Sequence, residues 1–237
     1  MKRRLLIVAA ALAAACSDIN AGPGGLIALE VTAPSPAVLE QGDTVTLLRA
    51  RAVDRNGDSV AAEIRWFTLD TAAITIVDST TSRMFGRLPS GTGRVQARSG
   101  GLGSDVITFT LLPRADTLVV PGPDTLRVAS ADTGSAELVA QVRSFAPAGP
   151  VAGRRMIYRV VEPAFAQPAD QTVALPGGGT ADTLLSGSDG QPSAPVVLLK
   201  IAGTTHPDSA IVEVRAYHLS GAEVAGSGQQ FIVRFDP

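Results

Sequence analysis

The sequence has few of the residues that carry most enzyme chemistry. Its 237 residues include one cysteine, Cys16, and two histidines, His206 and His218. A lone cysteine cannot form an intrachain disulfide, and a nucleophile–histidine–carboxylate set needs at least one placed histidine. A zinc site usually needs three or four nitrogen or sulfur ligands, and besides Cys16 this chain offers only the two histidines. We therefore expect no catalytic residues, no bound metal and no cofactor.

Aromatic residues and lysines are also scarce. Aromatics make up 4% of the chain and hydrophobic residues 45%, so its cores must be built from Val, Leu, Ile and Ala. Lysine occurs only at Lys2 and Lys200, and the formal net charge is −2. Nucleic acid is not expected as a partner, because phosphate binding needs a basic surface. The arginines are scattered among apolar neighbours, which indicates a codon or genome bias toward arginine and not a binding patch.

The N-terminus combines a basic start with a short apolar run. Lys2 and two arginines precede the apolar segment 5–15. A membrane-spanning helix needs about 20 apolar residues, so this segment is too short for a stable span. The pattern is typical of a secretory signal peptide, which we expect over residues 1–15.

Cys16 stands directly after this segment. The run Leu12-Ala13-Ala14-Ala15-Cys16 resembles the lipobox of bacterial lipoproteins, although Ala13 stands where that family usually has Leu. The resemblance implies that the Cys16 thiol is diacylglycerated, that the signal is cut before it, and that lipid on Cys16 holds the protein in a membrane. Ser17 in place of Asp resembles the default sorting to the outer membrane. The open alternative is an ordinary signal peptide beside an incidental cysteine.

Residues 16–27 include Gly-Pro-Gly-Gly, which predicts a flexible tether. From residue 28 onward, short apolar runs alternate with clusters of Gly, Pro, Asp, Asn and Ser, and we find no convincing amphipathic helix. In Thr46–Val53, for example, Leu48, Ala50 and Ala52 share one face of a strand. Such period-two alternation places one face in a core and the other in water. The pattern is typical of an all-β sandwich or barrel.

The first module resembles a bacterial Ig-like domain of group 2 over residues 28–113. The motifs that carry the resemblance are Gly42–Leu48, the hairpin turn Asp54–Asp58, Ile64–Trp66, Ile76–Asp78, Gly86–Leu88, Gly91–Ala97 and Val106–Phe109. Phe67 and Thr68 depart from the family, where small polar residues are more usual. The resemblance implies a β-sandwich of bacterial surface and secreted proteins, without catalytic residues.

Residues 114–237 form the second expected module, after a boundary at Leu112–Ala115. Apolar residues alternate in several runs, and Ala164–Thr183 is expected to be a long loop. No motif fixes the family of this module. The predicted fold is therefore all-β, with two tandem immunoglobulin-like β-sandwiches after a cleaved lipoprotein signal peptide.

Two motifs could be mistaken for sites. Asp54-x-Asn56-x-Asp58 resembles a calcium loop, but an EF-hand also needs Gly at the sixth and Glu at the twelfth position. Weak calcium binding through Asp54 or Asp58 stays open, without a named metal site. Gly177–Thr180 lacks the lysine and the strand-to-helix setting of a phosphate loop, so a flexible turn is expected.

The sequence thus favours a non-enzymatic, lipid-anchored protein of the cell envelope that presents Ig-like domains for binding, adhesion or scaffolding. Contact could use rim loops or strand addition at an exposed sheet edge. A polysaccharide-binding lipoprotein is the alternative, and an enzyme would need a cleft that gathers carboxylates. Polysaccharide binding would call for exposed aromatics on one face, for which the candidates are Phe67, Tyr217, Phe145 and Phe165.

Overall fold

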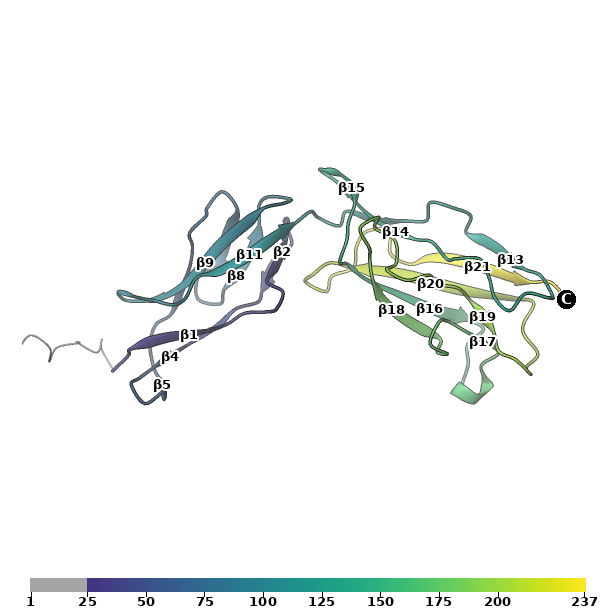
Figure 1. Cartoon of the computed structure of the whole chain (residues 1–237), viewed down its shortest axis with the longest axis horizontal. Helices are drawn as coiled ribbons and strands as arrows, with labels where there is room; N and C mark the ends of the chain where they lie inside the picture. Colours follow the sequence, from purple (N-terminus) through teal and green to yellow (C-terminus); the bar gives the residue numbers. More distant parts are fainter. Residues whose placement is uncertain (1–24) are drawn as a thin grey trace, which may run out of the picture. The chain divides into compact units, whose positions relative to one another are not determined.

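The computed structural model describes residues 25–237 (Figure 1). The expected signal peptide and Cys16 lie outside these residues. Within them the regular structure consists of strands β1 to β21 and one short 3-10 helix, η1 (Pro168–Asp170), which confirms the all-β prediction. No helix in this part of the chain is long and apolar enough to cross a membrane.

The described chain folds into two compact units. The first contains the residues up to Val38 together with Thr46–Met84 and Thr92–Phe109, and the second contains Leu39–Val45, Phe85–Gly91 and Thr110–Pro237. The second unit thus includes two short segments that precede its main stretch in the sequence. The domain boundary at Leu112–Ala115 remains a prediction.

Three sheets form between residues 28 and 112. Their strand orders are β1-β4-β5, β10-β9-β11-β2 with β6 also paired to β9, and β3-β8-β7. The strands are β1 (Ala28–Thr32), β2 (Val38–Glu40), β3 (Val45–Thr46), β4 (Arg49–Val53), β5 (Ser59–Val60), β6 (Arg65–Thr68), β7 (Ile74–Asp78), β8 (Arg83–Gly86), β9 (Thr92–Ser99), β10 (Leu102–Gly103) and β11 (Ile107–Leu112).

The core of the first unit follows from strand alternation. Trp66 on β6 pairs with Ala97 on β9, and both side chains are buried together with Val95. The neighbouring Arg65 and Phe67 point outward and are exposed. This arrangement places Trp66, the last residue of the Ile64–Trp66 motif, in the core.

The hairpin predicted at Asp54–Asp58 is present between β4 and β5. The carboxylate of Asp54 accepts hydrogen bonds from the backbone N–H groups of Asn56 at 2.8 Å and Asp58 at 3.0 Å. Gly57 has a φ of 84°, a left-handed conformation that glycine adopts without steric cost. The turn prediction is therefore confirmed.

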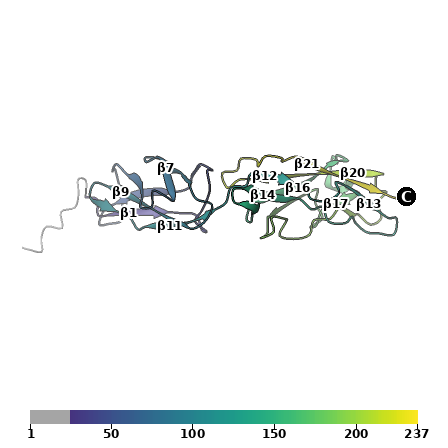
Figure 2. The ribbon, with the colours of Figure 1, turned by 90° about the horizontal axis from the view of Figure 1, so that it is seen from above.

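Three sheets also form in the stretch from residue 117 to 235. Their strand orders are β12-β14-β15, β13-β21-β20-β16-β18 and β17-β19, and β20 and β21 run side by side in both views (Figure 1, Figure 2). The strands are β12 (Thr117–Val119), β13 (Thr125–Val128), β14 (Gln141–Phe145), β15 (Ala148–Pro150), β16 (Arg155–Glu162), β17 (Val173–Ala174), β18 (Ala181–Leu185), β19 (Leu199–Lys200), β20 (Ser209–Tyr217) and β21 (Gln229–Phe235).

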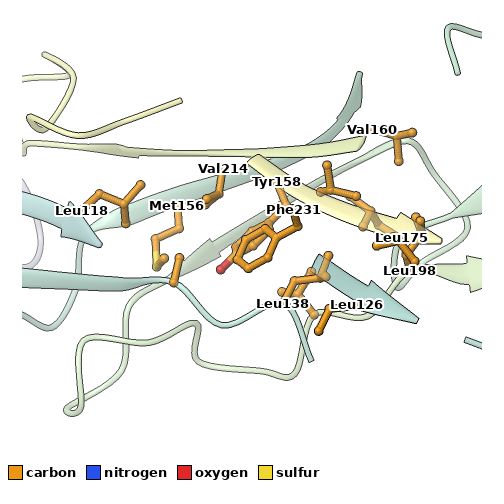
Figure 3. Packing of buried hydrophobic residues seen from close by; sticks show 14 of the residues in the cluster. Leu118, Leu126, Leu138, Met156, Tyr158, Val160, Leu175, Leu198, Val214 and Phe231 are labelled. Atoms are coloured by element: carbon orange, nitrogen blue, oxygen red, sulfur yellow. The ribbon is translucent and has the colours of Figure 1, made fainter. Parts of the chain in front are cut away.

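Aliphatic side chains and a few aromatics fill the core of the second unit (Figure 3). The rings of Tyr158 and Phe231 stack with their centroids 6.5 Å apart. The long loop expected over Ala164–Thr183 is partly wrong. Val173, Ala174 and Leu175 are buried, and the first two form β17. Their apolar side chains anchor the middle of this segment to the core.

Tyr158 is an aromatic residue with a polar group inside this core. Its hydroxyl is buried and lies near the backbone of Ala140, but no well-aligned hydrogen bond satisfies it. Burial raises the pKa of the Tyr158 phenol, and the contact with Ala140 opposes the rise only partly. A buried hydroxyl without a good partner costs free energy.

We therefore expect Tyr158→Phe to leave the free energy of unfolding unchanged or to raise it by about 1 kcal/mol, because the phenylalanine removes a poorly satisfied hydroxyl. Urea unfolding monitored by circular dichroism measures this difference. Tyr217→Phe is the matched control, since Tyr217 is the other tyrosine of the chain and is only half-buried. A loss of stability above about 1 kcal/mol in Tyr158→Phe would show that its hydroxyl makes a favourable hydrogen bond.

Candidate functional site

The two histidines lie in different surroundings within the second unit. The ring of His206 packs against the ring of Phe235 with the centroids 5.4 Å apart. His218 follows β20 and faces the carboxylate of Glu40, with His218 Nδ1 2.8 Å from Glu40 Oε1. Neither histidine is hydrogen-bonded to a serine, threonine or cysteine side chain among the described residues. They do not form a nucleophile–histidine pair there.

Glu40 and Arg154 form a fully buried ion pair. Both side chains are 0% exposed, and Arg154 Nε lies 3.0 Å from Glu40 Oε2, although this contact is poorly aligned as a hydrogen bond. Arg154 Nη1 donates to the carbonyl of Ala152 at 3.1 Å, and Nη2 donates to the carbonyl of Pro113 at 2.8 Å. The guanidinium is therefore held by one carboxylate and two backbone carbonyls.

The Glu40 carboxylate has further partners on both oxygens. Oε1 accepts the backbone N–H of Ala115 at 2.7 Å, besides its contact with His218. Oε2 accepts the backbone N–H of Leu219 at 3.1 Å. Nearby, Asp43 Oδ2 accepts the backbone N–H of Ser220 at 2.8 Å. We call Glu40, Asp43, Arg154 and His218 the buried charge cluster, and all four belong to the second unit.

Strand alternation explains why two members of the cluster meet. Arg155 pairs with Tyr217 across β16 and β20, and Met156 and Ala216 beside them point into the core. Because side chains alternate along a strand, Arg154 and His218 fall on the core side at the same end of this strand pair. The alternation of both strands was visible in the sequence. The partner Glu40 was not, because it lies more than a hundred residues away.

The surroundings of the cluster favour the charged form of Glu40 and disfavour that of Arg154. Burial alone would raise the pKa of the Glu40 carboxyl, but the hydrogen bond from His218, the charge of Arg154 and two backbone N–H groups outweigh it and lower the pKa below 4.5. Burial lowers the pKa of Arg154, while Glu40 and Asp43 oppose this effect. An arginine guanidinium stays protonated in proteins, so the pair is ionic at neutral pH.

Glu40, Asp43 and His218 bring possible metal ligands together, since their ligand atoms all lie within 4.8 Å of one another. Arg154 stands beside them as a buried cation, however, and each Glu40 oxygen already accepts a backbone N–H and lies against the side chain of Arg154 or His218. A divalent cation would have to displace these donors and approach a like charge. The cluster is therefore better suited to fasten backbone segments than to hold an ion.

The four aromatic candidates do not form a common platform. Phe67 is 43% exposed on β6 beside Arg98, and Phe145 is 69% exposed at the end of β14. Tyr217 lies on β20, in a different sheet from Phe145, and stacks under Arg155. Phe165 packs against the core of the second unit. Stacking of sugars on grouped aromatics thus finds no support within either unit.

The glycine-rich run also forms a turn. Gly177 and Gly178 have positive φ angles, and Gly178 donates its backbone N–H to the carbonyl of Leu175 at 3.0 Å. The geometry confirms that Gly177–Thr180 lies in a turn, and the flexibility of this turn stays a prediction. Cys16, the expected lipidation site, lies outside the described residues.

No family model and no curated protein matches the chain. Among solved structures, the adhesin InvE of Yersinia pseudotuberculosis is similar at 15% identity with a TM-score of 0.40, covering 91% of this chain and 61% of that one. The adhesin FdeC of Escherichia coli is similar at 14% identity with a TM-score of 0.40, covering 88% of this chain and 64% of that one. The fibronectin(III)-like modules of Clostridium thermocellum CbhA are similar at 15% identity with a TM-score of 0.36, covering 87% of this chain and 93% of that one. This chain spans about three fifths of the InvE structure. Likenesses this distant say nothing about activity.

We expect Glu40→Gln to lower the free energy of unfolding by about 3 kcal/mol, because it leaves Arg154 buried without its counter-charge. The double variant Glu40→Gln/Arg154→Met should recover part of the loss, since it removes both charges. Urea unfolding of the full chain measures these differences. The matched control is Glu30→Gln, which breaks the exposed pair with Arg51 and should change stability by less than about 1 kcal/mol. Equal effects of Glu40→Gln and Glu30→Gln would contradict the importance of the buried pair.

The same pair predicts a dependence of stability on pH. Because the folded-state pKa of Glu40 lies below the ordinary 4.5, its carboxylate stabilises the fold above that pH. The stabilisation is lost as the pH falls through the lower folded-state value. Melting temperatures of the wild type should therefore fall below pH 4.5 more steeply than those of Glu40→Gln.

Asp78 provides the control for this pH series. Hydrogen bonds from Thr80 and Thr81 lower the pKa of the Asp78 carboxyl from 3.8 to about 2, so its stabilisation is lost as the pH falls from 3.8 toward about 2, and Asp78→Asn should alter the profile only in that range. Parallel melting profiles for the wild type and Glu40→Gln from neutral pH to pH 3 would contradict the assignment to Glu40.

Proposed function

We propose that this chain is a non-enzymatic, lipid-anchored protein of the cell envelope, and that its two Ig-like β-sandwich units are presented for binding, adhesion or scaffolding. The observation that carries the proposal is which partners the buried polar groups of the second unit bind. The charged groups of the buried charge cluster bind backbone groups and one another, and no serine, threonine or cysteine side chain among the described residues is hydrogen-bonded to these charged groups. Contact with partners is left to the outside of the units.

The absence of an assembled catalytic set in residues 25–237 supports this view. An enzyme would need a cleft that gathers carboxylates or a nucleophile beside a base. The carboxylates of the cluster are buried or hydrogen-bonded to backbone, and His206 is packed on Phe235. Fold alone does not establish function, so the proposal depends on these side chains and not on the sandwich itself.

The envelope location follows from the N-terminal motifs. Cys16 at the end of a lipobox-like run would carry the lipids, and Ser17 after it favours the outer membrane. Two or more acyl chains anchor a protein stably, because each buried methylene contributes about 0.8 kcal/mol. The resemblance of residues 28–113 to group 2 bacterial Ig-like domains agrees with a module displayed at the envelope.

Metabolic labelling with radioactive palmitate tests the anchor. The full chain should take up the label and fractionate with membranes, whereas Cys16→Ala should lose the label and leave the membrane fraction. Ser17→Ala is the matched control and should keep both properties, because it leaves the thiol in place. An unlabelled wild type, or a labelled Cys16→Ala variant, would refute lipid anchoring through Cys16.

A further inference from the structure

The outer face of the sheet β13-β21-β20-β16-β18 carries a row of arginines. The inward side chains of these strands, such as Tyr158 and Val214, form the core, so the alternate residues point to the outside. We call this side the arginine face. Its cationic residues are Arg127 on β13, Arg234 on β21, Arg215 on β20, and Arg155 and Arg159 on β16.

Three of these arginines have no acidic partner within the described residues. Arg215 pairs with Glu213 at 2.6 Å and with Glu223 at 2.7 Å, and Arg127 pairs with Asp236 at 3.5 Å. Arg155, Arg159 and Arg234 are exposed and form no such ion pair there. The only contact of Arg155 with a charged or aromatic group described here is its stacking over the Tyr217 ring at 4.5 Å. The face therefore carries free positive charge, although the chain as a whole is slightly acidic.

The strand register fixes the spacing of these three arginines on the sheet. Arg155 and Arg159 are four residues apart on one strand, which is about 13 Å at a rise of about 3.3 Å per residue. Arg159 is level with Glu213 and Gln230, and Arg234 lies four residues beyond Gln230. With strands about 4.8 Å apart, Arg159 and Arg234 are separated by about 16 Å. The row thus follows β16 from Arg155 to Arg159 and then crosses obliquely to Arg234 on β21, and its spacing suits a long, repeating anion.

Aliphatic side chains fill the spaces between the arginines. Ile157 and Ile211 are half-buried on this face, and Ile232 is 36% exposed. The one aromatic side chain that alternation places on the outer side of these five strands, Tyr217, is half-buried under Arg155 and is not free to insert into a bilayer, as interfacial membrane binding would favour. A flat surface of short apolar side chains between guanidinium groups fits an extended polymer better than a membrane. Guanidinium groups bind carboxylate and similar anions through paired hydrogen bonds.

We infer that the arginine face docks an anionic polysaccharide, whose acidic groups bind Arg155, Arg159 and Arg234 while its sugar rings lie over the isoleucines. The inference rests on the proposed binding role of the protein and names the chemistry of one partner. It differs from aromatic stacking of a neutral sugar, for which the structure shows no platform in either unit.

Binding of the full chain, purified in detergent, to immobilised polygalacturonate tests this inference. The wild type should bind polygalacturonate, and its affinity should fall as salt is added. It should not bind dextran, which is uncharged. The triple variant Arg155→Gln/Arg159→Gln/Arg234→Gln should bind roughly tenfold more weakly, because each exposed charge contact contributes only modestly. Circular dichroism should show the same fold, since all three side chains are exposed.

The matched control removes three exposed, unpaired arginines elsewhere, in the variant Arg49→Gln/Arg83→Gln/Arg143→Gln. This control carries the same net charge as the test variant and should bind like the wild type. Equal weakening of both variants would show attraction by net charge alone and would overturn the inference. So would the absence of binding at low salt, or binding to vesicles of phosphatidylglycerol and phosphatidylcholine in place of polygalacturonate. Failure here leaves palmitate labelling and membrane fractionation unchanged, so the two proposals are tested separately.

Discussion

The structure depends on one constraint, which is that successive side chains of a strand point to opposite faces. In β16, Met156, Tyr158 and Val160 are buried, while Arg155 and Arg159 are exposed. In β20, Val212, Val214 and Ala216 are buried in the same way. The inner residues supply the apolar area that stabilises each unit, at about 25 cal/mol per Å² removed from water. The outer residues are left free for contact with other molecules.

The buried charge cluster continues this alternation beyond the ends of the strands. Arg154 and His218 occupy inward positions where the apolar pattern stops, and Glu40 supplies the counter-charge from a segment distant in sequence. A buried ion pair gives little net stability compared with well-packed apolar residues, but it penalises any arrangement that separates the partners. The cluster thus favours one arrangement of the segments around residues 40, 115, 154 and 219.

Much of the fold was predictable because alternation is a local property. The turn at Asp54–Asp58 was predicted from a short stretch of sequence, and the structure confirms it. The core positions of Trp66, Met156 and Phe231 follow from the same kind of local pattern, since each lies on the inward side of its strand. The Glu40–Arg154 pair could not be predicted, since neither residue indicates its partner. The loop predicted around Val173 was partly wrong, because neighbouring Pro and Gly residues obscured three core residues. The row of arginines could be recognised only from the strand register, because composition does not show which residues lie side by side in a sheet.

Together these features describe sheets whose inner faces stabilise the protein and whose outer faces are available for binding. Amide hydrogen exchange of the full chain, followed residue by residue, is the most direct test of this division. The account predicts the slowest exchange in the central strands β16, β20 and β21 of the second unit, and fast exchange in turns such as Asp54–Asp58. Uniformly fast exchange through Arg155–Glu162 and Ser209–Tyr217 would contradict it.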